Sequence, residues 1–227
     1  MTSTTNQTAP DHGQDLLAMV EAGRAALAAG DLSEARTAFE AVVCAFPDEA
    51  VGHNNLGAFY MGVGDHAAAE TAFQRVVDLL PGNANCLFNL GTAQFHQARY
   101  DAAAETFAAA KAADPDDPET LNNLGAARFQ AGRIAEARHD LEAALQRQPN
   151  YPSAVINLSD LEYAAGRLDR AIGICQAYLD HHQDGAVSRQ LLTLVDLANH
   201  QHAENEVAAA EDPAPETDEP RADAATP

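Results

Sequence analysis

The sequence has few basic residues. It contains 13 lysines and arginines against 34 aspartates and glutamates over 227 residues, which gives a formal net charge of −21 at pH 7. A nucleic-acid surface needs clustered lysine and arginine side chains that neutralise phosphates, and anionic membranes also attract basic segments. We therefore expect no nucleic acid and no membrane as a partner.

Cysteines and long apolar runs are also scarce. Cys44, Cys86 and Cys175 lie far apart and form no CxxC pair, so we expect three reduced cysteines that pack in the protein. No run approaches the roughly 18 consecutive apolar residues that suggest a membrane-spanning helix. The first residues have neither the basic start nor the apolar stretch of a signal peptide, which favours a cytoplasmic location.

Patterns typical of catalysis or metal binding are missing as well. No serine, cysteine or lysine lies in a recognisable nucleophile motif, and we expect the carboxylates to lie mainly on solvated helix faces. Four histidines near the end of the chain lack the close, fixed spacing of a structural metal site; they are His181, His182, His200 and His202. We expect no enzymatic activity, no cofactor and no metal.

The sequence does contain a repeated unit of 34 residues. Residues 50–83 read as a helix, a turn at Gly64-Asp65, a second helix and a stop at Pro81-Gly82. One such hairpin cannot bury its apolar face alone, so it needs stacked copies. Four classes of position keep the same spacing: Pro47, Pro81, Pro115 and Pro149; Gly23, Gly57, Gly91 and Gly125, followed by Ser159; Ala35, Ala69, Ala103, Ala137 and Ala171; Phe39, Phe73, Phe107, Leu141 and Cys175.

These positions resemble the tetratricopeptide repeat, a helix-turn-helix unit with a small residue at position 8, alanine at 20, an aromatic at 24 and proline at 32. The resemblance covers roughly residues 16–185, with Ala50 at position 1 of the second repeat. It implies an all-α fold, a right-handed α-solenoid of about five helical hairpins. An amphipathic segment at 186–202 is expected to cap the open end as one further helix.

The two ends of the chain differ in composition from the repeats. Residues 1–14 are polar, and residues 203–227 are rich in Glu, Asp, Pro and Ala. Neither segment has enough apolar surface to offset its ordering entropy. We expect disorder over 1–14, the array with its cap over 15–202, and a disordered acidic tail over 203–227. This tail either keeps the protein soluble or binds a basic partner or the chain itself.

The first helices of such hairpins line a concave groove, so their inward positions carry the candidate binding residues. Position 6 holds Asn55, Asn89, Asn123 and Asn157. A carboxamide both donates and accepts hydrogen bonds, which suits the backbone of an extended peptide. Similar ladders in the repeats of the O-linked N-acetylglucosamine transferases hold peptide backbone. The alternative is that asparagine at position 6, which is common in this family, serves local packing.

Aromatic and basic groups add to this groove. Phe95, Phe129 and Tyr163 at position 12 are candidate anchors for partner side chains, although this position often packs against the next repeat. Arg24 at position 9 is the only basic residue at an obvious inward position. The chaperone-binding members of the family hold acidic peptides with lysine and arginine at positions 2, 5 and 6. Positions 2 and 5 have neither here, so we expect a neutral to basic partner.

The sequence thus predicts a non-enzymatic protein-protein interaction scaffold, with a monomer favoured. Its groove is expected to bind an extended peptide or a partner helix. Two alternatives stay open. One is an accessory subunit that positions substrate for a separate enzyme such as a glycosyltransferase, and the other is a self-assembling structural protein.

Overall fold

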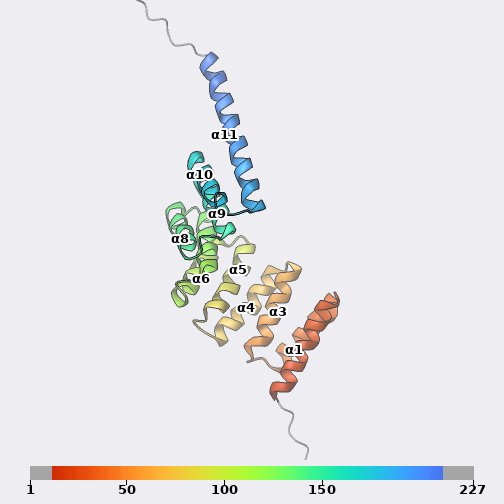
Figure 1. Ribbon diagram of the computed structural model, residues 1–227. Helices are drawn as coiled ribbons and strands as arrows, with labels where there is room; N and C mark the ends of the chain where they lie inside the picture. Colours follow the sequence, from red (N-terminus) through yellow and green to blue (C-terminus); the bar gives the residue numbers. More distant parts are fainter. Residues whose placement is uncertain (1–11, 212–227) are drawn as a thin grey trace, which may run out of the picture.

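The chain folds into a stack of helices with no strand among the residues that the structure describes, 12–211 in this computed structural model (Figure 1). The first ten helices form five hairpins, and the eleventh has no second helix. The hairpins are α1 (His12–Ala28) with α2 (Leu32–Ala45), α3 (Ala50–Val63) with α4 (His66–Leu79), α5 (Ala84–His96) with α6 (Tyr100–Ala113), α7 (Pro118–Gln130) with α8 (Ile134–Arg147), and α9 (Pro152–Ala164) with α10 (Leu168–Leu179). The predicted all-α solenoid of five hairpins is confirmed.

The turns within the hairpins follow from their glycines. Gly30, Gly64, Gly132 and Gly166 all have positive φ, between +74° and +81°, a conformation that glycine adopts without steric cost. The third hairpin has Ala98 at this place with φ +58°. These residues follow the end of each first helix, at Gly64 as the sequence predicted, so the second helix can fold back along the first.

The core of each hairpin is a close contact between positions 8 and 24. A Cβ atom built on Gly57 would lie 2.6 Å from Cε1 of Phe73, and one on Gly91 would lie 2.9 Å from the ring of Phe107. Both rings are almost fully buried. Only glycine lets the two helices and the ring occupy this space. In the fifth hairpin the pair is Ser159 and Cys175, and both residues are fully buried. The smaller side chain at position 24 leaves room for the larger one at position 8.

This exchange of volume gives a first testable prediction. Cys175→Phe should lower the free energy of unfolding by about 1–3 kcal/mol, the usual cost of overpacking a core. Adding Ser159→Gly should recover at least half of the loss, because it restores the glycine-phenylalanine pair of the first three hairpins. Urea unfolding of the two single variants and the double variant measures the coupling. A double variant no more stable than Cys175→Phe would contradict this account.

The helix α11 (Gly185–Glu211) closes the last hairpin. Its Val187 and Leu194 are buried against Cys175 and Tyr178, which confirms the predicted capping contact. The helix is longer than predicted and continues past residue 202 to Glu211, extending away from the array (Figure 1). At the other end α1 begins at His12, within the segment 1–14 that was expected to be disordered. The rest of the two predicted disordered segments lies outside the described residues.

The cysteines agree with the sequence analysis in part. All three are free thiols, and Cys86 and Cys175 are buried as predicted. Cys44 is exposed on α2, so the prediction of a packing role is wrong for this residue. The reason is its place on the solvent side of the helix, two residues beyond the buried Val42.

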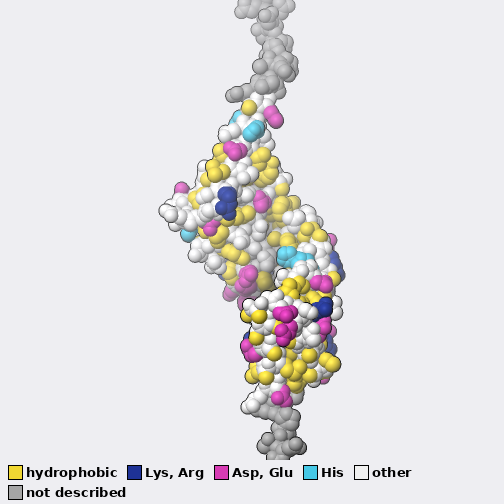
Figure 2. Space-filling view, turned by 90° about the vertical axis from the view of Figure 1, so that its right-hand side faces the viewer, with side chains coloured by type: hydrophobic (Ala, Val, Ile, Leu, Met, Phe, Trp, Pro, Cys, Tyr) yellow, Lys and Arg dark blue, Asp and Glu magenta, His cyan; other side chains and the backbone are white. Residues whose placement is uncertain are grey.

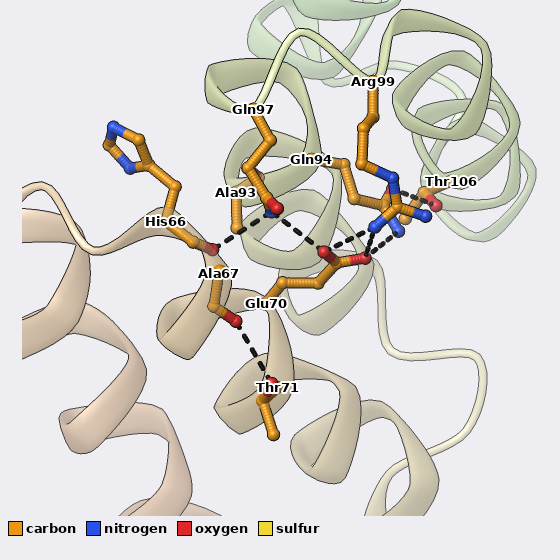
Figure 3. Close-up of polar contacts among 9 residues, drawn as sticks. All are labelled: His66, Ala67, Glu70, Thr71, Ala93, Gln94, Gln97, Arg99 and Thr106. Atoms are coloured by element: carbon orange, nitrogen blue, oxygen red, sulfur yellow. Dashed lines mark hydrogen bonds and ion pairs between the residues drawn. The ribbon is translucent and has the colours of Figure 1, made fainter.

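A cluster of hydrogen bonds around Glu70 joins the second hairpin to the third. Gln94 Nε2 donates a hydrogen bond to Glu70 Oε1 at 3.2 Å, and Gln97 Nε2 donates one to Glu70 Oε2 at 2.8 Å (Figure 3). Arg99 forms an ion pair with the same carboxylate. Burial alone would raise the pKa of Glu70, but the hydrogen bonds from Gln97, Gln94 and Arg99 outweigh it, so its pKa is lowered. The junction is therefore held by an ionised carboxylate.

This lowered pKa predicts a pH-dependent contribution to stability. The stabilisation by Glu70 is complete above its unfolded-state pKa of about 4.3 and is lost as the pH falls through the lower folded-state value. Glu70→Gln should therefore lower the free energy of unfolding by about 1–2 kcal/mol at pH 7 and by progressively less below pH ~4. Urea unfolding at several pH values measures this. Glu105→Gln on the exposed side of α6 is the control, and an equal pH profile for both variants would refute the prediction.

Candidate functional site: a carboxamide-lined groove

Two of the four predicted asparagines bond to the preceding hairpin. Asn89 Nδ2 donates to Asn54 Oδ1 at 3.2 Å, and Asn157 Nδ2 donates to Asn122 Oδ1 at 2.9 Å. The acceptors are asparagines at position 5 of the hairpin before, 35 residues earlier in the chain. Part of the ladder therefore connects the first helices of successive hairpins.

At each end of the asparagine ladder, a charged side chain at position 9 bonds to the carboxamide on the next helix of the ladder. Arg24 Nε donates to Asn55 Oδ1 at 3.2 Å, and Asn55 Nδ2 donates to the Val51 carbonyl oxygen at 2.7 Å. Arg24 Nη1 also forms an ion pair with Glu21 Oε1 at 3.0 Å. Both polar groups of Asn55 and the guanidinium of Arg24 thus have partners within the fold.

At the other end Gln190 of α11 takes the place of the next asparagine. Its Nε2 donates to Asp160 Oδ1 at 2.5 Å. Burial raises the pKa of Asp160, and the bond from Gln190 lowers it in part. The sequence analysis missed Gln190 because α11 starts at Gly185, 33 residues after Pro152 at the start of α9, so a strict spacing of 34 points to Leu191 instead.

The middle of the ladder keeps free polar groups. Asn123 Oδ1 accepts from Asn122 Nδ2 at 3.0 Å, whereas Asn123 Nδ2 has no partner among the residues that the structure describes. Within residues 12–211 the same is true of the Oδ1 atoms of Asn89 and Asn157. One donor and two acceptors are thus available to a ligand on α5, α7 and α9.

A cavity of about 220 Å³ lies beside two of these groups, those of Asn123 and Asn157, between the third, fourth and fifth hairpins. It is lined by Thr92, Phe95, His96, Phe107, Asn123, Ala126 and Asn157. The structure therefore brings together three predicted site residues, Phe95, Asn123 and Asn157. The sequence analysis did not single out Thr92 and Ala126 as site residues. The signal that could have found them is the small side chain at position 9 in the middle hairpins.

The other predicted aromatic residues do not join this cavity. Phe129 is half-buried and packs against the core that includes Leu141 and Leu161. Tyr163 has 38% of its surface exposed but does not line the cavity. Phe95 packs at the junction of the third and fourth hairpins and Phe129 at that of the fourth and fifth, so these two rings are separated along the array.

The surface charge agrees with the composition. In Figure 2 acidic side chains are spread over the visible face, and basic ones are sparse. Within residues 12–211 no group of three or more His, Cys, Asp or Glu side chains is placed to hold a metal ion. None of the helices in this part of the chain combines the length and apolar character needed to cross a membrane.

Comparison with known families decides the classification. Models of the tetratricopeptide repeat match residues 20–84, 60–118 and 128–195, which together make up well over half of the chain. The chain belongs to the tetratricopeptide repeat family. A comparison with curated proteins finds no match for this tetratricopeptide protein.

Several solved structures share its fold. The crystal structure of MamA is 22% identical with a TM-score of 0.68, covering 74% of this chain and 92% of MamA. PilF of Pseudomonas aeruginosa is 19% identical with a TM-score of 0.65, covering 88% and 92%. The first tetratricopeptide domain of Spaghetti (RPAP3), bound to the HSP90 peptide SRMEEVD, is 25% identical with a TM-score of 0.50, covering 52% and 93%. The first two likenesses support the fold alone.

Proposed function

We propose that this tetratricopeptide protein is a non-enzymatic scaffold whose groove binds an extended segment of a protein partner. Membership of the family implies protein-protein interaction. The observation that carries the proposal for the groove is the free amide groups of Asn123 and Asn157 beside one cavity. An extended backbone presents alternating donors and acceptors that match such groups.

The charge of the groove argues for a neutral to basic segment. Spaghetti (RPAP3) is a similar protein that binds the acidic peptide SRMEEVD. In this chain positions 2 and 5 of the repeats hold no lysine or arginine, and Arg24 is already bonded to Glu21 and Asn55. A net charge of −21 also repels an acidic partner and attracts a basic one.

Removal of the free amides should weaken binding. We expect the double substitution Asn123→Ala, Asn157→Ala to lower the affinity for a captured partner segment about tenfold, since each neutral hydrogen bond contributes roughly 0.5–1.5 kcal/mol and tenfold corresponds to about 1.4 kcal/mol. The partner is captured from extracts of the source cell, its binding segment is mapped with overlapping peptides, and affinities are measured by fluorescence anisotropy.

Two further chains make the result decisive. Asn55→Ala is the matched control at the same repeat position, because its polar groups are already bonded inside the fold and should add little to binding. A chain ending at Glu211 keeps α11 whole and removes the last residues. If binding survives the double substitution and disappears in the shortened chain, the groove is not the binding site.

A further inference from the structure

The size of the groove cavity limits what can enter it. Its volume is about 220 Å³. A cavity of roughly 150 Å³ in a protein core is large enough to hold benzene. The cavity between the third, fourth and fifth hairpins therefore has room for one phenyl ring or one branched aliphatic side chain, and for little more.

The lining of the cavity limits the chemistry of that side chain. Phe95, Phe107 and Ala126 supply apolar surface, and Thr92 Oγ1 is already used in a bond to the Phe88 carbonyl oxygen at 2.9 Å. No lysine, arginine, aspartate or glutamate is among the lining residues, and the only titratable one, His96, is exposed. A charged side chain would lose its hydration here without gaining an ion partner, which is costly. An uncharged, apolar side chain fits.

The cavity also presents polar groups that suit the backbone of the partner residue whose side chain enters it. Asn123 and Asn157 line the cavity, and Asn123 Nδ2 and Asn157 Oδ1 have no partner among residues 12–211. Together they offer one donor for a backbone carbonyl oxygen and one acceptor for a backbone N–H. The rest of the ladder differs at its two ends, where the charged residues at position 9, Arg24 and Asp160, are bonded to the next carboxamide.

We infer that the partner segment carries one anchor residue with an uncharged aromatic or branched aliphatic side chain. That side chain fills the cavity between Phe95, Phe107 and Ala126, while Asn123 and Asn157 hold the backbone of the anchor. This inference rests on the proposed groove function and specifies which class of segment the groove selects. Lysine, arginine, aspartate and glutamate are rejected at the anchor position, and basic residues are accepted elsewhere in the segment.

Selection from a library of random peptides displayed on phage, against the full chain, tests the inference. The bound peptides should share one Phe, Tyr, Leu, Ile or Val at a fixed place. Alanine at that place should weaken binding about thirtyfold, which corresponds to the roughly 2 kcal/mol at which an interface hot spot begins. Ala126→Leu, which fills the cavity from its wall, should weaken binding by a similar factor. Ala58→Leu is the control, since it makes the same change at position 9 of the second hairpin, outside the cavity.

The outcomes separate the inference from the function on which it rests. Peptides that need Asn123 and Asn157 but share no apolar residue, or that bind the Ala126→Leu variant unchanged, overturn the anchor and leave groove binding in place. If no selected peptide depends on Asn123 and Asn157, both the groove function and the anchor are refuted. Thermal unfolding of each variant shows whether a loss of binding reflects a loss of fold.

Discussion

Phe107→Ala should lower the free energy of unfolding by about 4 kcal/mol, near the middle of the range for deleting a buried aromatic ring. The side chain is 1% exposed and packs over Gly91 of its own hairpin and against Leu124 and Ala127 of the next. Its removal leaves a cavity at the centre of the array, where neighbouring hairpins cannot close in without losing their own contacts. Urea unfolding followed by circular dichroism measures the loss.

The chain itself provides the control for this prediction. Leu141 occupies the same repeat position in the fourth hairpin and packs over Gly125. Phe107→Leu should therefore cost much less, about 1.5 kcal/mol or below. If the leucine and alanine variants were equally unstable, the ring itself rather than the filled volume would be what the hairpin requires.

A second large loss should follow from removing the cations around Asp140. This carboxylate is fully buried, and it is bonded by Lys111 Nζ at 2.8 Å and by Arg128. The double substitution Lys111→Ala, Arg128→Ala leaves a buried charge without compensation. We expect it to lower the free energy of unfolding by about 3–5 kcal/mol, as for other broken buried ion pairs.

Removing the charge as well should reverse most of that loss. The residues at the position of Asp140 in the other hairpins are uncharged: Ala38, Ala72, Thr106 and Ile174. Adding Asp140→Ala to the double variant should therefore restore at least half of the lost free energy in urea unfolding. If the triple variant stays as unstable as the double one, the loss comes from the missing lysine and arginine stems and not from the unpaired carboxylate.

The buried carboxylates also show a limit of the sequence analysis. We expected acidic side chains mainly on solvated faces, yet Asp140 and Glu162 are fully buried, the latter with Arg138 Nε at 2.7 Å. A helical pattern indicates which residues face the partner helix of the same hairpin. It does not indicate which residues face the next hairpin, because that depends on how two hairpins are rotated against each other.

The sequence predicted the candidate site only in part. The spacing of 34 placed Asn89, Asn123 and Asn157 on one side of the array, and the structure has Asn123 and Asn157 at the same cavity as Phe95. The spacing could not show that the amide of Asn89 reaches Asn54, or that Arg24 covers Asn55. Such bonds join residues more than 30 positions apart and depend on distances between stacked helices.

The sequence by itself determined the helices, their turns and the pairing within each hairpin. These features are local, since a glycine that must adopt positive φ, a small residue opposite a ring and a stop proline act within one repeat of 34 residues. The tertiary structure alone decided which carboxamides stay free, where a cavity opens and that Gln190 of α11 bonds to Asp160. Those outcomes depend on the fit between neighbouring hairpins, in which a shift of one residue replaces the side chain that faces the groove.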